Sequence, residues 1–320
     1  MKKIIAILTL VSILLLVAGC EGNTSTTSKG GYIGGNQGLI IQYALDSPPA
    51  KVLDADQETF SIALQLTNKG EYDIKAGEVI ATLTGINYIT YGITDSTLKN
   101  VAQIEKVKKT AEGIVLDGGV STDISYTAGY KEDLPVDQSE TIVTNVCYRY
   151  QTEATTAMCL RKEVTGKGET SDSCKVGDAL IAGNSGAPIQ ITQMTESIAG
   201  KNQVSLTMKI ENVGTGVAYT PEGLLEGKCS ETGTKLKDYK NKVQVQVSFP
   251  TLPSAAVSCG KFKGTSSGTL DLVGGKTTTL SCTIDTTNLQ ETTFTSSPKV
   301  LVDYMYKESI NQAIQIQNVL

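Results

Sequence analysis

The chain has 320 residues, of which 40% are hydrophobic, and a formal net charge of −5. This composition allows a substantial core, and no long basic cluster provides an electrostatic footprint for nucleic acid. The chain has no histidine, which excludes serine–histidine–acid and cysteine–histidine catalysis in their usual forms and removes the commonest ligand of zinc, copper and iron. We therefore expect no catalytic residue, no metal site and no cofactor, although carboxylate, lysine or tyrosine chemistry stays open.

The first twenty residues have a charged start, an apolar middle and a small-residue end. Lys2 and Lys3 precede the apolar residues 4–17, and Ala18, Gly19 and Cys20 close the segment. This is the layout of a secretory signal peptide, which we predict over residues 1–19. A retained membrane-spanning anchor is an alternative, but the apolar run is shorter than the ~18–20 residues that a span needs.

Residues 16–20 (LVAGC) resemble the lipobox of secreted lipoproteins, in which processing leaves the cysteine as the first residue and its thiol carries lipid. The resemblance implies a lipidated Cys20, with membrane lipid as the first partner, and an extracytoplasmic protein anchored to the cell membrane. An ordinary signal peptide with an incidental cysteine is the alternative. Residues 20–38 are rich in Gly, Ser, Thr and Asn without an apolar period, so we predict a lipid-anchored flexible tether there.

Strand patterns dominate the rest of the chain. Residues 60–66, 204–210 and 243–247 alternate apolar and polar side chains, and this strict period of two predicts strands with one face in the core. Turn residues follow two of these runs, as Asn68-Lys69-Gly70 and Asn212-Val213-Gly214. One stretch, residues 98–107, has apolar residues spaced by three, which leaves a helix, a loop or an edge strand open.

The chain also repeats itself. Residues 60–70 match 204–214 at a displacement of 144 positions, which is 204 minus 60. Residues 116–126 match 272–282, and 146–150 match 302–306, both displaced by 156, which is 272 minus 116 and 302 minus 146. A period near 150 residues predicts a duplicated domain. The change in displacement implies about twelve extra residues in the second copy, which fit the loop region 220–242.

Each copy holds enough short strands for two stacked antiparallel sheets, so we predict an all-β chain of two tandem immunoglobulin-like β-sandwiches. The first spans residues 39–165, a polar linker follows at 166–175, and the second spans 176–320. The strand followed by Asn-x-Gly resembles CARDB-like modules and other immunoglobulin-like domains of archaeal and bacterial surface proteins. That resemblance implies a binding, adhesive or structural part of the cell surface, with no catalytic residues to carry over.

Six cysteines remain besides Cys20, and an even number in an exported chain predicts disulfides. No close C-x-x-C pair favours a metal site. These cysteines are Cys147, Cys159, Cys174, Cys229, Cys259 and Cys282. We predict a Cys147–Cys159 disulfide across a hairpin that turns near Glu153. We predict Cys174–Cys229 because neither cysteine has a counterpart in the first copy. The third predicted disulfide, Cys259–Cys282, joins the two strands around Gly274-Gly275.

Four tyrosines stand at period two in matching positions of the two copies: Tyr148, Tyr150, Tyr304 and Tyr306. We interpret them as core residues whose hydroxyls reach the rim, with a sugar-binding platform as the alternative. Two acidic segments, which begin at Asp54 and Asp117, are interpreted as turns rather than calcium loops, because calcium needs six to eight oxygens.

These observations favour a non-catalytic, membrane-anchored surface protein that binds a protein or glycan partner or serves as a structural module of the envelope. The alternative is an extracytoplasmic hydrolase or ligand carrier with a site between the domains. A deep cleft lined by carboxylates or tyrosines would favour the alternative, and shallow surface grooves would favour the binding module. We also expect the fragments 38–163 and 173–320 to fold separately, each with its own core.

Overall fold

The computed structural model describes residues 31–164, 174–177, 179–180, 182–224, 236–289 and 293–319. The predicted signal peptide, the predicted lipidation site Cys20, Cys229 and most of the predicted linker lie outside the described residues. The described chain is all-β, with short turns, one short helix and two single-turn 3₁₀ segments, which confirms the predicted fold class. These helical segments are α2 (Pro221–Leu224), η3 (Ser254–Ala256) and η4 (Gly260–Phe262).

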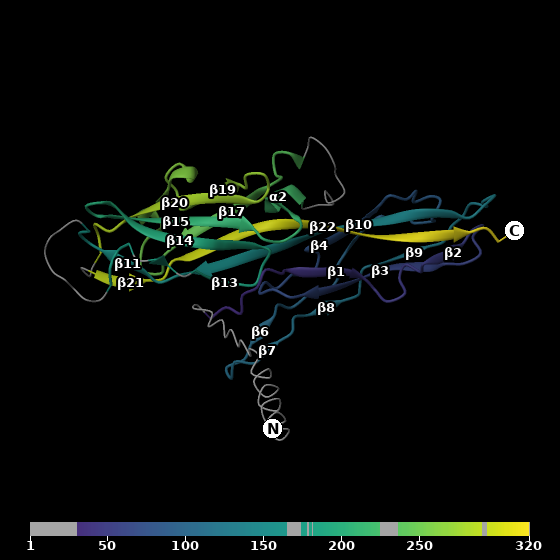
Figure 1. The fold of residues 1–320 in the computed structure, drawn as a ribbon, viewed down its shortest axis with the longest axis horizontal. Helices are drawn as coiled ribbons and strands as arrows, with labels where there is room; N and C mark the ends of the chain where they lie inside the picture. The colour runs from purple at the N-terminus through teal and green to yellow at the C-terminus, as the bar shows by residue number, and fades with distance from the viewer. Residues whose placement is uncertain are drawn as a thin grey trace, which may run out of the picture.

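A nine-stranded sheet runs along the long axis of the molecule and contains strands from both copies (Figure 1). Its main order is β19-β17-β22-β10-β4-β5; β2 and β16 pair with further parts of β22, and β13 pairs with a further part of β10. The strands are β2 (Lys51–Leu53), β4 (Val79–Thr84), β5 (Thr97–Lys99), β10 (Gln138–Thr155), β13 (Gly183–Asn184), β16 (Val217–Tyr219), β17 (Lys242–Ser248), β19 (Ser267–Asp271) and β22 (Lys299–Gln317). We call it the shared sheet.

The two longest strands, β10 and β22, pair antiparallel at the centre of the shared sheet. The register is unbroken over all 18 residues of β10, from Gln138 opposite Ile316 to Thr155 opposite Lys299. Arg149 lies opposite Met305, which is also its counterpart in the repeat, since 305 minus 149 is 156. The repeat is therefore arranged about a pseudo-twofold axis that passes between these two residues.

Each copy adds a smaller sheet of its own, which packs on one part of the shared sheet and completes a β-sandwich. In the first half this sheet contains β1 (Leu39–Tyr43), β3 (Phe60–Asn68), β8 (Val120–Ser121) and β9 (Ser125–Ala128). In the second half it contains β12 (Ala179–Leu180), β14 (Ile189–Gly200), β15 (Gln203–Asn212), β18 (Val257–Cys259) and β20 (Thr277–Asp285). Two further pairs are β6 (Lys108–Lys109) with β7 (Val115–Leu116), and β11 (Met158–Arg161) with β21 (Thr293–Ser296).

One hydrophobic core runs through both halves, because the inward faces of β10 and β22 belong to both sandwiches. The expectation that each half buries its own core without a strand from the other is therefore corrected. The predicted boundaries at 165 and 176 stay predictions. The helix considered for residues 98–107 is not present: β5 ends at Lys99, and Ile104 makes a bridge to Ile74 instead.

The four tyrosines lie at the centre of this core, as the alternation predicts. Tyr148, Tyr150, Tyr304 and Tyr306 are at most 1% exposed, and their rings form a closed circuit with centroid distances of 5.8–6.4 Å. Edge-on and tilted packing of this kind stabilises aromatic clusters beyond the area that they bury. A sugar-binding platform would need exposed rings, so that alternative is wrong.

The Asn-x-Gly segments form the same corner in both halves. The Tyr150 hydroxyl donates to Asn68 Oδ1 at 3.0 Å, and the Tyr306 hydroxyl donates to Asn212 Oδ1 at 2.8 Å. A side chain at Gly70 would overlap the Tyr150 hydroxyl and the Gly186 carbonyl, and one at Gly214 would overlap the Tyr306 hydroxyl. The glycine thus makes room for the tyrosine that the asparagine holds.

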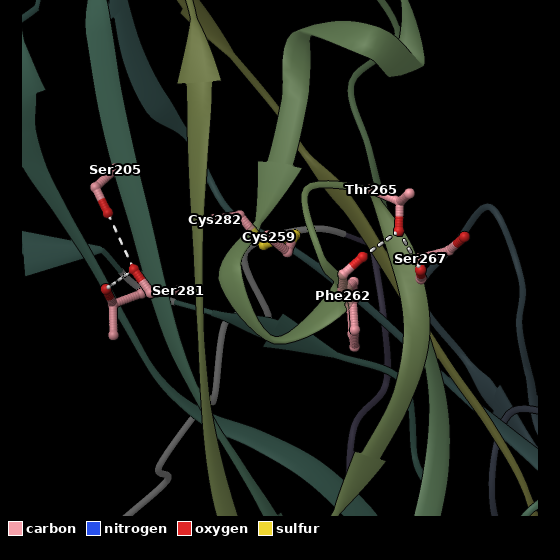
Figure 2. The surroundings of a disulfide bond; sticks show 8 residues. Ser205, Cys259, Phe262, Thr265, Ser267, Ser281 and Cys282 are labelled. Carbon is pink, nitrogen blue, oxygen red and sulfur yellow. Dashed lines mark hydrogen bonds between the residues drawn. A yellow bond between two sulfur atoms is a disulfide. The ribbon is translucent and has the colours of Figure 1, made fainter.

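Two disulfides are present among the described residues: Cys159–Cys174 and Cys259–Cys282. The pairing Cys259–Cys282 is confirmed; it joins directly opposed residues of β18 and β20 beside η4 (Figure 2). Because Cys159 bonds to Cys174, the predicted pairings Cys147–Cys159 and Cys174–Cys229 are both wrong. The physical reason is that β10 does not turn near Glu153 but continues to Thr155, so Cys147 stays on β10 while Cys159 lies beyond it on β11.

Cys147 faces away from the main core, on the outer face of the shared sheet. It is fully buried there in a small second cluster with Ile80, Met305, Tyr219 and Leu236, and it too is disulfide-bonded. Tyr219 immediately precedes the inserted loop region 220–242 that the repeat comparison identified, and Leu236 lies within it. The insertion of the second copy thus packs over strands from both halves.

Candidate functional site

The outer face of the shared sheet carries a row of polar side chains across four strands. Thr269 of β19 lies opposite Gln244 of β17, Gln244 lies opposite Asp303 of β22, and Asp303 lies opposite Gln151 of β10. Neighbouring strands are about 4.8 Å apart, so the row is roughly 14 Å long. The row exists because the apolar residues of β17, such as Val245, point into the core and leave the alternate glutamines outside.

This row forms the floor of an open groove with a volume of about 420 Å³. We call it the glutamine groove. Its side chains come from both copies, because Gln151 belongs to the first half and the rest belong to the second. They are Gln151, Gln244, Gln246, Ser267, Thr269, Leu301 and Asp303.

Charges border the groove on two sides. Arg149 Nη2 lies 2.7 Å from Asp303 Oδ2, and Arg149 Nη1 lies 3.9 Å from Glu78 Oε1. Gln244 Nε2 donates to Glu222 Oε1 of α2 at 2.5 Å. The Asp303 carboxylate is thus held by an arginine, and the amides supply both donors and acceptors at fixed spacing.

A second pocket, of about 400 Å³, lies where the two halves meet on the other face of the shared sheet. It is lined by residues 36–41, Tyr148, Pro188, residues 213–215 and residues 308–310, and we call it the Glu308 pocket. Thr215 Oγ1 donates to Glu308 Oε1 at 3.2 Å. Burial raises the pKa of the Glu308 carboxyl, although the hydrogen bond from Thr215 opposes the shift.

At the pseudo-symmetric position on the other side of the axis, the counterpart side chains hydrogen-bond to the backbone. The counterpart of Glu308 is Thr152, since 308 minus 156 is 152, and Thr152 Oγ1 donates to the Ile189 carbonyl at 2.6 Å. The counterpart of Thr215 is Glu71, since 215 minus 144 is 71. Its carboxylate accepts hydrogen bonds from the backbone N–H groups of Ile33, Gly34 and Gly186 at 2.7–3.0 Å. The acid and the threonine have therefore exchanged places between the halves.

Neither site brings two carboxylates together for acid–base work of the glycosidase kind, which needs a pair flanking the substrate. The glutamine groove offers amides, hydroxyls and one paired carboxylate, which suits hydrogen bonding to a polar ligand. The Glu308 pocket offers one carboxyl beside the Tyr148 phenol, whose pKa burial raises well above its usual value. It could hold a small polar or cationic ligand.

The acidic segment that begins at Asp54 forms the predicted turn, whereas the one that begins at Asp117 is an irregular connection between β7 and β8 and not a turn. Ala55 and Asp56 adopt left-handed backbone conformations, and the Asp54 carboxylate accepts hydrogen bonds from the backbone N–H groups of Leu134 and Val319. Within the described residues, no group of three or more potential ligands is placed to hold a metal ion. No helix in the same part of the chain is long and apolar enough to cross a membrane.

Sequence reasoning missed both sites. The groove depends on the pairing of β17 with β22 and of β22 with β10, which no local pattern specifies. Glu308 did leave a signal, because it interrupts the inward-facing series Val302, Tyr304, Tyr306 of a long alternating strand. A carboxylate at such a position indicates a partly buried charge.

No family model matches the chain, and no curated protein matches it. Among solved structures, it is similar to the secreted serine protease VesC from Vibrio cholerae, with 10% sequence identity and a TM-score of 0.17 over 83% of this chain and 50% of that one. It is also similar to the major capsid protein P2 from bacteriophage PM2, with 11% identity and a TM-score of 0.15 over 83% of this chain and 97% of that one. The chain thus spans half the length of the protease, and scores this low support no assignment of function.

Proposed function

We propose that this chain is a non-catalytic surface protein of the cell envelope, anchored through a lipidated Cys20, which binds an extracytoplasmic partner through the glutamine groove. The observation that carries the proposal is the row of Thr269, Gln244, Asp303 and Gln151 in register across strands of both halves. Paired strands on a shared core hold these side chains rigidly, so little order has to be gained on binding.

The chemistry of the groove favours a polar polymer over an apolar one. Amide and hydroxyl groups in an open groove match the hydroxyls and amides of a glycan or of an extended polar peptide. We propose a glycan as the partner, because the groove runs across the strands rather than along an unpaired edge, where a peptide would add as a strand.

The partner is tested by incubating the chain from residue 22 onward with native envelope fractions and with immobilised envelope glycans. The double variant Gln244→Ala/Gln246→Ala removes two amides from the groove floor. At about 1 kcal/mol for each lost hydrogen bond, retention on the glycan is expected to fall at least about tenfold.

A matched control is Gln42→Ala/Gln193→Ala, which removes two exposed glutamines from β1 and β14 on the smaller sheets. The control is expected to be retained like the wild type. Equal retention of both double variants would refute the groove as the binding site. The anchor is tested separately by mass spectrometry, where wild-type protein with an unmodified Cys20 thiol would refute lipidation.

A ligand carrier is the second candidate, and the Glu308 pocket favours it. A small cationic ligand seated there would depend on the Glu308 carboxylate. A ligand that co-purifies with the wild type but not with a Glu308→Gln variant would support this candidate. Unchanged glycan retention in the same variant would show that the pocket acts separately from the groove.

A further inference from the structure

The β6–β7 hairpin of the first half exposes apolar side chains on both of its faces. Ile114, Val115, Leu116 and the neighbouring Val120 are 61%, 51%, 49% and 57% exposed. Successive residues of a strand point to opposite faces, so three exposed apolar residues in a row mean that neither face of the hairpin lies on the body. We call residues 108–120 the apolar hairpin. A two-stranded hairpin with this composition is marginal in water, and such an exposed patch marks an interaction site.

The base of the apolar hairpin and the start of the described chain are attached to the same turn. The Val107 N–H donates to the Gly70 carbonyl at 2.9 Å. The next residue, Glu71, holds the backbone of Ile33 and Gly34 at 3.0 and 2.9 Å. The hairpin projects from the body on the side of β1 and β8, whereas β17 and β19 lie on the opposite side (Figure 1).

The length of chain before this turn limits how far it can lie from the anchor. Cys20 is eleven residues before Gly31, so even fully extended chain could separate them by at most about 40 Å. A lipid on Cys20 would therefore keep the start of the described chain within about 40 Å of the bilayer surface. The Gly70–Glu71 turn and the base of the hairpin, which are bonded to it, are held within similar reach.

We propose that the apolar hairpin docks in the interfacial region of the lipid bilayer and so fixes the orientation of the protein on the membrane. This inference rests on the lipid anchor of the proposed function. The apolar side chains of β7 and Val120 enter the boundary of headgroups and acyl chains, while Lys108 and Lys109 of β6 place their ammonium groups among the headgroups.

Contact is driven by apolar burial rather than by net charge. Lys108 lies 2.6 Å from Glu105 and Lys106 lies 4.0 Å from Asp73, so acidic neighbours balance these two lysines at the base of the hairpin. The membrane is favoured over a protein partner because the anchor already brings lipid within reach. With the hairpin on the bilayer, the glutamine groove points away from it.

The chain has no tryptophan, so one introduced tryptophan reports its own surroundings. The test uses the chain from residue 22 onward with an N-terminal His-tag, tethered to phosphatidylcholine vesicles that contain a nickel-chelating lipid and brominated phosphatidylcholine. The tether replaces the lipid at the same end of the chain. The test variant is Val115→Trp, and the matched control is Val273→Trp at an exposed valine of the second half (73% exposed). Both sites are at the surface, so both variants are expected to unfold like the wild type.

The Val115→Trp emission is expected to shift to the blue and to be quenched several-fold more strongly than that of Val273→Trp. Equal quenching of the two would overturn the proposal, and so would the absence of quenching in both. A blue shift of Val115→Trp that depends on protein concentration and not on vesicles would also overturn it, because it would indicate a second copy as the occupant. An unmodified Cys20 in the native protein would refute the lipid anchor without changing the outcome of this tethered measurement.

Discussion

At the matched positions 126 and 282, the two halves are cross-linked by different means: the first half joins its smaller sheet to the shared sheet, and the second half joins two neighbouring strands of its smaller sheet. In the first half the Tyr126 hydroxyl donates to the Ala81 carbonyl of the shared sheet at 2.8 Å. In the second half Cys282 bonds to Cys259, which fastens β18 to the smaller sheet. Close by, Thr265 Oγ1 donates to the carbonyls of Phe262 and Ser267, which closes the turn after η4 (Figure 2).

The two halves differ most in one segment, which runs from β4 to β8 in the first half and from β17 to β20 in the second. The first half uses it to project the apolar hairpin, and the second half folds η3, β18 and η4 back onto the core. By contrast, the corner of Asn68 and Tyr150 is reproduced by Asn212 and Tyr306. This difference indicates that the corner and the shared sheet determine the fold, whereas the connections between them can acquire separate roles.

Separating the halves should have the largest effect. The fragments 38–163 and 173–320 would each lose the partner of an 18-residue strand and expose half of the tyrosine cluster. We now expect neither to unfold cooperatively alone, and a mixture to recover β-type circular dichroism and one cooperative transition. Cooperative unfolding of either fragment as a monomer would restore the view of two independent domains.

The two glycine corners should differ in how they tolerate a methyl group. Gly70→Ala is expected to cost about 4 kcal/mol, as overpacking plus the lost tyrosine hydrogen bond, and Gly214→Ala about 1 kcal/mol less. The reason is that a Cβ at Gly70 also meets the Gly186 carbonyl, whereas a Cβ at Gly214 meets the Pro188 side chain at 2.8 Å.

Urea unfolding of the single variants and of the pairs with Tyr→Phe checks this prediction. Tyr306→Phe should partly rescue Gly214→Ala, because it removes the hydroxyl that the methyl group meets. Tyr150→Phe should rescue Gly70→Ala less. Equal rescue in both halves would mean that the corners are energetically equivalent.

Removing these two cross-links should give unequal losses of stability. Cys259→Ala/Cys282→Ala opens a loop with a sequence separation of 23 and is expected to cost about 3 kcal/mol. Tyr126→Phe removes one buried hydrogen bond to the Ala81 carbonyl and is expected to cost about 1 kcal/mol. Thermal unfolding measures both, and a larger loss for Tyr126→Phe would contradict the assignment of the stronger connection to the second half.

The smallest effect concerns the exchanged acid at Glu308. Its folded-state pKa is raised above the ordinary value of 4.5, so ionisation costs more in the folded state than in the unfolded state. As the pH rises, this free-energy cost first appears near the ordinary pKa and reaches its full size above the raised pKa. The Glu308 carboxylate therefore destabilises the folded state increasingly as the pH rises through that window. Glu308→Gln should remove this dependence and add at most about 1 kcal/mol at neutral pH. Denaturation curves of the wild type and of Glu308→Gln, measured at several pH values across that window, test this prediction. The same pH dependence of stability in both proteins would contradict it.

Much of the fold could be predicted from the sequence, because alternation and turns are local signals. Residues 60–66 and 204–210 became β3 and β15, and the inward period of Tyr148 and Tyr150 placed both in the core. The polar residues 151–155 were mistaken for a turn, although Thr152 and Ala154 continue the inward alternation of β10. The pairing of β10 with β22, and with it both candidate sites, depends on contacts between residues 144 to 178 positions apart (299 minus 155 and 316 minus 138) that no local pattern encodes.

The pseudo-twofold axis between Arg149 and Met305 also bears on what a single chain can do that a symmetric dimer cannot. In a homodimer built on this ladder, the residue on the axis would face its own copy, and two arginines there would repel each other. Because both halves belong to one chain, the axis holds one arginine and one methionine. The arginine pairs with Asp303 on one side and approaches Glu78 on the other, while the methionine joins the small apolar cluster with Ile80 and Cys147. Covalent fusion thus releases the most constrained position of a symmetric interface, and a polar groove and an apolar cluster can form side by side there.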